Sequence, residues 1–160
     1  LEMFGFGKTI EILSPIEGSS LPLSECGDEA FAEEMLGKGL AVLPAKGLVV
    51  APFHAKVEVL FDTAHALSLL SDEGVELLIH IGIDTVKLQG KHFKALVKQG
   101  DRVRAGEALI EFDPAAIREE GYSTVVPVVV CNSADYAAVE SFPGRKLGML
   151  DKPFIRIRKK

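Results

Sequence analysis

Two histidines on the arms of a predicted β-hairpin are the residues of this chain that most directly suggest chemistry. His65 lies in the apolar run before Ser71–Gly74, a turn signal, and His80 lies in the run that follows it. If Asp72 and Glu73 are the two turn residues, His65 and His80 stand directly opposite each other. Their Cβ atoms would then be ~5 Å apart on the same face of the hairpin.

Three interpretations fit two facing imidazoles. Each ring could be an ordinary half-buried strand residue, although two adjacent imidazoles repel each other when protonated. The pair could be half of a metal site, but no carboxylate or third histidine is placed to complete it. One neutral ring nitrogen could instead accept a phosphoryl group while the other ring donates a hydrogen bond to its oxygens. Thr63, two residues before His65, has a hydroxyl that could fix the tautomer of that ring.

The rest of the chain predicts the β-structure that would position this hairpin. β-Branched residues favour strands, and glycine and proline close them. Short apolar runs recur with turn residues between them, which favours an all-β antiparallel sandwich or barrel over alternating strands and helices. The predicted strands are Thr9–Leu13, Gly39–Leu43, Leu48–Ala51, Ala55–Phe61, Ala66–Leu70, Val75–Ile81, Arg102–Val103, Ala108–Asp113, Thr124–Val130 and Ile155–Arg158.

Helical signals are confined to three short segments. Asp28–Leu36 and Gly90–Gln99 each predict a helical turn from their apolar spacing. Pro114–Glu120 begins with a proline after Asp113, which is a good signal for a helix start.

A weak repeat relates two predicted strand ends. The segment Ile12–Ile16 matches Val49–Phe53 at an offset of 37 residues, and each contains a proline at the same place. Two explanations fit this match equally well. One is the chance recurrence of a strand, a proline and a turn, and the other is a duplicated β unit of the kind found in carrier domains.

Composition limits the partners and the compartment. The 160 residues are 48% hydrophobic and carry a net charge of −5, which indicates a globular protein and argues against nucleic acid as a partner. Apolar runs are too short for a membrane helix, and no signal peptide is recognisable. Cys26 and Cys131 form no CxxC pattern and are expected to be reduced thiols of a cytosolic protein. The first residue, Leu1, suggests a domain cut from a longer chain.

The segments around the two histidines resemble a known phosphohistidine motif. Thr63-Ala64-His65-Ala66 and Leu78-Ile79-His80-Ile81-Gly82-Ile83-Asp84-Thr85-Val86 are similar to the IIA component of the glucose family of the bacterial phosphoenolpyruvate-dependent sugar phosphotransferase system. The segments Ser14–Gly18, Phe31–Gly39 and Gly100–Asp113 fit the same family. The resemblance implies an antiparallel β-sandwich of the duplicated hybrid-motif type. It also implies one IIA domain over residues 1–160, excised from a longer permease.

The resemblance also implies a role for each site residue. His80 is expected to accept a phosphoryl group on Nε2 from the phosphohistidine of the carrier HPr and to pass it to a cysteine of a IIB domain. His65 would support the phosphoryl group, and Thr63 would bond the His65 ring. The Gly82 carbonyl would hold the Nδ1–H of His80 and leave Nε2 free. No metal or cofactor is implied, because the donor is already a phosphoprotein, and the location implied is the cytoplasm.

A docking face for the donor is expected around these histidines. It should be an apolar depression with an acidic rim, in which Asp28 and Asp84 would meet arginine on the partner. Phe61 and Val86 could equally well be core residues, and Leu78 stands where relatives often have phenylalanine. The apolar candidates for this face are Phe31, Met35, Leu36, Phe61, Leu78 and Val86.

Other classes of function fit the sequence less well. A biotinyl or lipoyl carrier of related β architecture would need an exposed lysine in a Met-Lys-Met or Asp-Lys-Ala setting, and the sequence has neither. A zinc peptidase would need a further histidine and an aspartate in fixed spacing. A regulatory binding module stays open, because IIA proteins of this family also bind other proteins according to their phosphorylation state. The sugar is not specified, since that choice belongs to the IIB and IIC parts.

Overall fold

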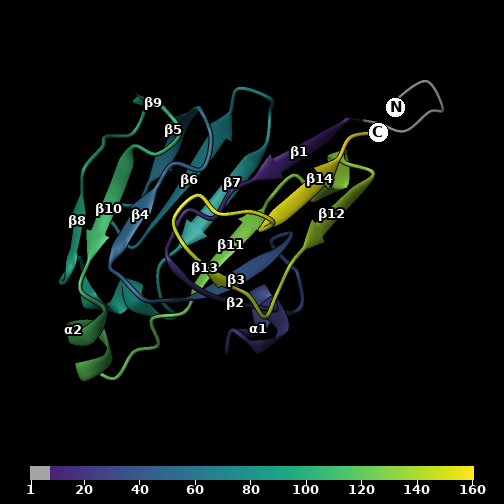
Figure 1. Ribbon diagram of the computed structural model, residues 1–160. Coiled ribbons are helices and arrows are strands. Elements are labelled where there is room, and N and C mark those ends of the chain that lie inside the picture. Colours follow the sequence, from purple (N-terminus) through teal and green to yellow (C-terminus); the bar gives the residue numbers. More distant parts are fainter. Residues whose placement is uncertain (1–7) are drawn as a thin grey trace.

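Antiparallel strands make up most of the regular secondary structure (Figure 1). The computed structural model describes residues 8–160, and Leu1 lies outside them. The strands are β1 (Thr9–Ile12), β2 (Gly18–Leu21), β3 (Lys38–Pro44), β4 (Leu48–Val50), β5 (Ala55–Leu60), β6 (Ala66–Ser71), β7 (Glu76–His80), β8 (Phe93–Ala95), β9 (Arg102–Val103), β10 (Ala108–Phe112), β11 (Val126–Val130), β12 (Ala138–Ser141), β13 (Lys146–Leu147) and β14 (Ile155–Arg158).

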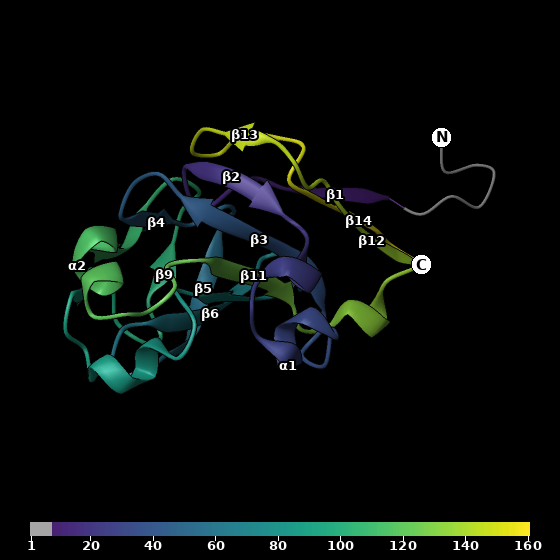
Figure 2. The ribbon, with the colours of Figure 1, turned by 90° about the horizontal axis from the view of Figure 1, so that it is seen from below.

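Three sheets pack around one core, which confirms the predicted β-sandwich class. The large sheet has the order β13-β2-β3-β11-β7-β6-β5-β9, and the small sheets have the orders β1-β14-β12 and β4-β10-β8. Figure 2 shows the large sheet curving from β13 and β2 on one side to β5 and β6 on the other. Ile12, Leu67 and Ile110 come one from each sheet, and all three are fully buried in the same cluster. Apolar burial of this kind is the main force that holds such sheets together.

All ten predicted strands are present, and the structure adds β2, β8, β12 and β13. The helix predicted over Gly90–Gln99 is wrong, because Phe93–Ala95 pairs with β10 as a strand. The ring of Phe93 stacks on that of Phe112 with centroids 6.5 Å apart. The chain then turns, and the Leu96 N–H donates to the carbonyl of Leu109. The apolar spacing that imitated a helix therefore arises from a strand followed by a turn.

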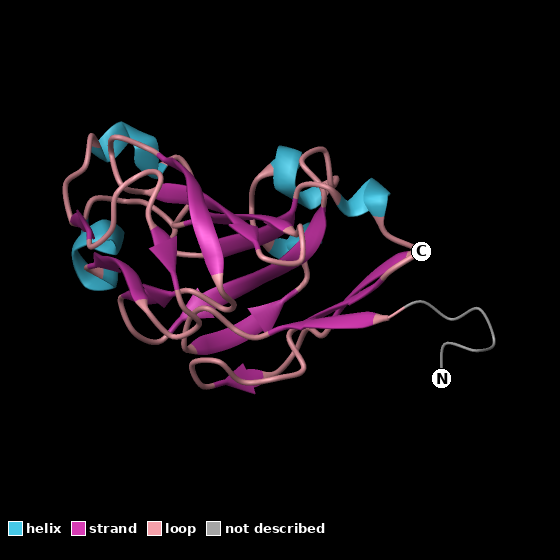
Figure 3. Cartoon of the chain, turned by 90° about the horizontal axis from the view of Figure 1, so that it is seen from above, coloured by secondary structure: helices cyan, strands magenta, loops and turns pink. Residues whose placement is uncertain are grey.

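The other two helical predictions are confirmed over fewer residues. The helix α1 (Glu29–Ala32) begins after Asp28, whose carboxylate accepts the Phe31 N–H at 3.2 Å. The helix α2 (Pro114–Glu119) begins after Asp113, whose carboxylate caps it in the same way. Figure 3 shows that the short helices lie at the periphery of the strands. Their N-termini are set by local side-chain caps, which is why the sequence could locate them.

The two halves of the predicted repeat have equivalent surroundings. Ser14 donates its N–H to the carbonyl of Asp151 and accepts from the N–H of Leu150. Ala51, at the same place in the second copy, donates its N–H to the carbonyl of Glu107 and accepts from the N–H of Gly106. Each strand end is therefore clamped by two hydrogen bonds from a distant loop. This correspondence supports the interpretation of the repeat as two related β units.

The register predicted for the histidine hairpin is wrong by one residue. In the structure Ala66, and not His65, stands opposite His80. The Ser71 N–H donates to the carbonyl of Val75, so the loop contains three residues where two were expected. Gly74 has φ +93° and supplies the left-handed residue that a three-residue hairpin loop needs. A sequence pattern with a glycine at this place is compatible with both loop lengths.

Candidate functional site

A bend before β6 brings the two histidines together despite the different register. In a straight strand, neighbours of Ala66 would point to the opposite face from His80. The strand β6 begins only after His65, and Ala64 has the left-handed φ of +56°. The carbonyl of His65 accepts the N–H of Ile81 at 2.7 Å, which ties the bend to the end of β7. The two rings consequently meet edge to face, with centroids 4.9 Å apart at an angle of 83°.

Each imidazole makes a hydrogen bond through Nδ1, as expected. The Nδ1 of His80 donates to the carbonyl oxygen of Gly82 at 2.8 Å. Since a carbonyl can only accept, the neutral ring of His80 carries its proton on Nδ1 and has a lone pair on Nε2. The Nδ1 of His65 lies 2.5 Å from the hydroxyl oxygen of Thr63. When that hydroxyl donates, the neutral His65 ring carries its proton on Nε2.

Burial keeps both rings neutral near pH 7. His65 is 3% exposed, and its burial, aided by a charge on His80, lowers its pKa from 6.5 to about 4. Burial also lowers the pKa of His80, against the opposing effects of the Gly82 carbonyl and of the carboxylates of Asp28 and Asp84. Desolvation disfavours the charged form of an imidazole, whereas nearby carboxylates favour it. His80 is therefore an available nitrogen nucleophile at neutral pH.

Two phenylalanines flank the histidine pair. The ring of Phe31 lies 5.2 Å from that of His80, and the ring of Phe61 lies 5.3 Å from that of His65, in both cases between centroids. Phe31 is only 6% exposed, and the capping bond from Asp28 fixes the start of its helix. Phe61 is 42% exposed and covers His65, which is itself only 3% exposed. Phe31 thus forms a buried wall of the site, and Phe61 forms part of its rim.

The other residues predicted for the docking face differ in exposure. Met35, Leu36 and Val86 are exposed at 71%, 45% and 50%, which is unusual for large apolar side chains and fits a partner surface. Leu78 is partly buried against the small cluster that contains Phe31. Both Asp28 and Asp84 act on the charge of His80 and so lie near it. That these residues form a single docking face remains a prediction.

Met35 and Leu36 also border a separate groove. Its volume is about 500 Å³, and Cys131 and Tyr136 lie along it. Partial burial and the carboxylate of Glu76 raise the pKa of the Cys131 thiol, which disfavours its reactive thiolate form.

Three residues around the His80 loop were missed at the level of sequence. The Thr85 hydroxyl donates to the carbonyl of Ile81 at 2.5 Å. The carbonyl of Val125 accepts the N–H of Gly82, and the carbonyl of Ser123 accepts the N–H of Ile83. Thr85 lies within the motif around His80, so its place in the sequence was a signal. Ser123 and Val125 reach the site only through the fold and carry no local signal.

Metal-binding and membrane-spanning features were sought over residues 8–160. In this range no group of three or more His, Cys, Asp or Glu side chains is arranged to hold a metal ion. The helices in the same range are all too short or too polar to cross a bilayer.

Comparison with known sequences identifies similar proteins. A family model described as phosphoenolpyruvate-dependent sugar phosphotransferase system, EIIA 1, matches residues 10–136. The chain is 41% identical to the PTS system glucose-specific EIIA component of Oceanobacillus iheyensis, over 84% of the chain and 81% of that protein. It is 47% identical to the PTS system beta-glucoside-specific EIIBCA component of Halalkalibacterium halodurans, over 82% of the chain and 21% of that protein. The chain therefore spans about a fifth of the length of this longer relative.

A solved structure matches over almost the whole length. Glucose permease IIA from Mycoplasma capricolum superimposes with a TM-score of 0.83 and is 31% identical in sequence. The match covers 96% of this chain and 97% of that structure. This chain therefore shares its overall fold with that structure.

Proposed function

Because the chain belongs to the EIIA 1 family of the phosphoenolpyruvate-dependent sugar phosphotransferase system, we propose that His80 is its phosphoryl acceptor and Nε2 the reacting atom. The observation that carries this proposal is the hydrogen bond from Nδ1 of His80 to the Gly82 carbonyl. It holds the only ring proton on Nδ1 and leaves a lone pair on Nε2. The partial exposure of His80 allows a donor to reach that nitrogen.

Transfer from the phosphohistidine of HPr requires little further chemistry. The nitrogen–phosphorus bond of the donor breaks as the Nε2–phosphorus bond of His80 forms, and the donor imidazole leaves with the electron pair. The His80 ring becomes more positive at that moment, and the Gly82 carbonyl stabilises it through Nδ1–H. In-line placement of the two nitrogens and stabilisation of charge supply most of the reduction in the barrier. A cysteine thiolate of IIB then takes the phosphoryl group and returns the lone pair to Nε2.

His65 is proposed to stabilise the phosphoryl group without carrying it. Its ring stands edge-on to that of His80, so Nε2–H can be directed at a phosphoryl oxygen. Thr63 holds the opposite nitrogen and thereby favours the tautomer with that proton. Two phosphorylated rings at this spacing would repel each other strongly, so only one of them can be the carrier.

Asp28 and Asp84 are proposed to form an acidic rim that meets basic side chains of HPr and IIB. Asp84 is exposed and caps no helix with its carboxylate, so its charge is free to attract a partner. The carboxylate of Asp28 is held in place by the Phe31 N–H. Such rim charges act mainly on the rate of association. The exposed side chains of Met35, Leu36, Phe61 and Val86 would supply the apolar contacts of the same face.

The chain is proposed to act as a IIA domain over its full length, within a longer permease. Similar proteins named EIIBCA components support this arrangement and also support a IIB domain as the recipient. The relatives include both beta-glucoside-specific EIIBCA components and a glucose-specific EIICBA component, so they do not point to one sugar. A cytoplasmic position is proposed with the family, and the free thiols of Cys26 and Cys131 are in keeping with a reducing compartment.

Incubation with phosphoenolpyruvate, enzyme I and HPr, followed by mass spectrometry, tests the proposal. The wild-type chain should gain one acid-labile phosphoryl group, and the His80→Gln variant should gain none while remaining folded. His54→Gln is the matched control, because His54 is an exposed histidine whose Nδ1 accepts the backbone N–H of Ala105. Stoichiometric labelling of His80→Gln, or no labelling of the wild type, would contradict the proposal.

A further inference from the structure

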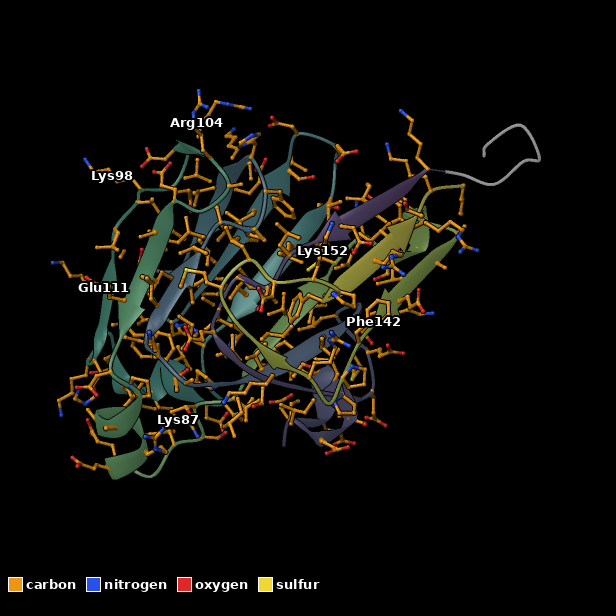
Figure 4. All side chains as sticks on the ribbon, viewed as in Figure 1. Lys87, Lys98, Arg104, Glu111, Phe142 and Lys152 are labelled. Carbon is orange, nitrogen blue, oxygen red and sulfur yellow. The ribbon has the colours of Figure 1, made fainter. Side chains whose placement is uncertain are left out.

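Thr85 is a buried polar residue that has no assigned role in the proposed phosphoryl transfer. It is completely buried and is the first residue of the short helix η3 (Thr85–Leu88). Lys87, two residues later, is exposed, and Figure 4 shows it at the end of the molecule where α2 lies. The turn therefore presents one side to solvent and turns Thr85 inward, towards the loop that follows His80.

The side chain of Thr85 contacts that loop with both of its branches. Its hydroxyl donates to the carbonyl of Ile81 at 2.5 Å. Its methyl group lies against Gly82, since a Cβ on Gly82 would come within 2.4 Å of the Thr85 Cγ2 atom. The same Cβ would come within 2.7 Å of the carbonyl oxygen of Ser123. The backbone of Gly82, with φ +80°, is therefore enclosed from two directions.

These contacts fix the peptide units on both sides of Gly82. In the Ile81–Gly82 unit, Thr85 holds the carbonyl and Val125 holds the N–H. In the Gly82–Ile83 unit, Ser123 holds the N–H, and the carbonyl accepts the Nδ1–H of His80. Within residues 8–160, the Thr85 bond is the one anchor of the first unit that a side chain provides. A substitution can remove it without altering any backbone partner.

We propose that Thr85 is a positioning residue for phosphoryl transfer. Its hydroxyl holds the Ile81–Gly82 peptide in the orientation that directs the next carbonyl, that of Gly82, at Nδ1 of His80. That carbonyl selects the tautomer with a free Nε2, so Thr85 acts on the nucleophile through two backbone units. The inference rests on the proposed function of His80 and extends it to a residue that touches neither donor nor phosphoryl group.

Two substitutions of Thr85 separate this role from simple packing. Thr85→Val keeps the shape and removes the hydroxyl, whereas Thr85→Ser keeps the hydroxyl. Ser14→Ala is the matched control, because Ser14 is also fully buried and donates its hydroxyl to a backbone carbonyl, that of Ile16 at 2.6 Å. The tautomer of His80 is measured by nitrogen-15 NMR of the whole chain. The single-turnover rate from phospho-HPr and the thermal midpoint are measured on the same samples.

Thr85→Val should populate the other tautomer of His80 and slow transfer about fivefold to tenfold, as loss of one neutral hydrogen bond predicts. Its affinity for HPr should not change, and Thr85→Ser should restore the rate to within about twofold. Ser14→Ala should lose thermal stability and keep the wild-type tautomer and rate. A Thr85→Val variant that behaves like Ser14→Ala would overturn the proposal.

Two further results keep the test decisive. If Thr85→Val does not fold, Thr85→Ala removes the same hydroxyl with less bulk and is judged by the same two readouts. If the wild type is not labelled by phospho-HPr, the proposed function of His80 fails. The tautomer measurement needs no partner, so it still decides whether Thr85 positions the ring.

Discussion

The buried neutral state of His65 should make the stability of the protein depend on pH between about 6.5 and 4. The folded pKa lies below the unfolded value, so the unfolded chain binds more protons within this range. The stabilisation is therefore complete above pH 6.5, decreases as the pH falls, and levels off below the folded pKa of about 4. Removing His65 should remove this part of the pH dependence.

The size of the effect follows from the two pKa values. The interval from 6.5 to about 4 corresponds to about 3 kcal/mol of unfolding free energy, at about 1.4 kcal/mol for each pKa unit. Most of this, about 2.5 kcal/mol, should already be lost at about pH 4.5. The side chain is 3% exposed, so little screening by solvent reduces the figure. Such a loss is a large fraction of the stability of an ordinary domain.

Urea unfolding of the wild type and of His65→Gln, at several values between about pH 7.5 and 4.5, measures the effect. His65→Gln should be less stable at the higher pH, because it loses the contact with Thr63. The difference between the two proteins should shrink by about 2.5 kcal/mol at the lower pH. A difference between wild type and His65→Gln that does not change with pH would refute the assignment of His65 as a buried neutral ring.

Three further predictions concern transfer, docking and the backbone. His65→Gln should still accept a phosphoryl group from HPr but pass it to IIB about 10²- to 10³-fold more slowly, as two single-turnover rates would show. If His65→Gln loses the first step completely and His80→Gln does not, the roles of the two histidines are reversed. Asp84→Asn should slow transfer from HPr at low salt and weaken the salt dependence of that rate. Its unfolding free energy should change by less than about 0.5 kcal/mol, because asparagine tolerates the φ of +61° at this position. An unchanged transfer rate would remove Asp84 from the docking face. Gly82→Ala should lose more unfolding free energy than Gly74→Ala, since both glycines have positive φ but only Gly82 is enclosed by neighbouring atoms. The backbone strain that both substitutions share is about 1 kcal/mol. Equal losses in urea unfolding would contradict the enclosure of Gly82.

The strands were readable from the sequence because their signals are local. Alternating and continuous apolar runs closed by glycine and proline located ten of the strands, including both central and edge strands. The starts of α1 and α2 were located by Asp28 and Asp113, whose carboxylates cap the next turn without help from distant residues. The strands β2, β8, β12 and β13 were missed, since together they contain one buried hydrophobic side chain, that of Leu147.

The histidine pair could be proposed from the sequence, but its geometry could not. The pairing of His65 with His80 was expected from a two-residue turn, whereas the structure achieves it through a three-residue loop and a bend at Ala64. A glycine tolerates several loop conformations equally well, so the choice between them is made by the packing of the whole sheet. The edge-to-face contact of the rings is a result of that choice.

Partners that are far apart in the chain were decided by tertiary structure alone. The resemblance named the Gly82 carbonyl, but the enclosure of Gly82 by Ser123 and Thr85 appears only when the segment after α2 is folded against the His80 loop. Burial likewise separates Phe31, a wall of the site, from Phe61, which stays at its rim. Residue types and short spacings carry the chemistry of a site in the sequence. The orientation of the functional groups in the site, and their access to water, depend on contacts that form only in the folded chain.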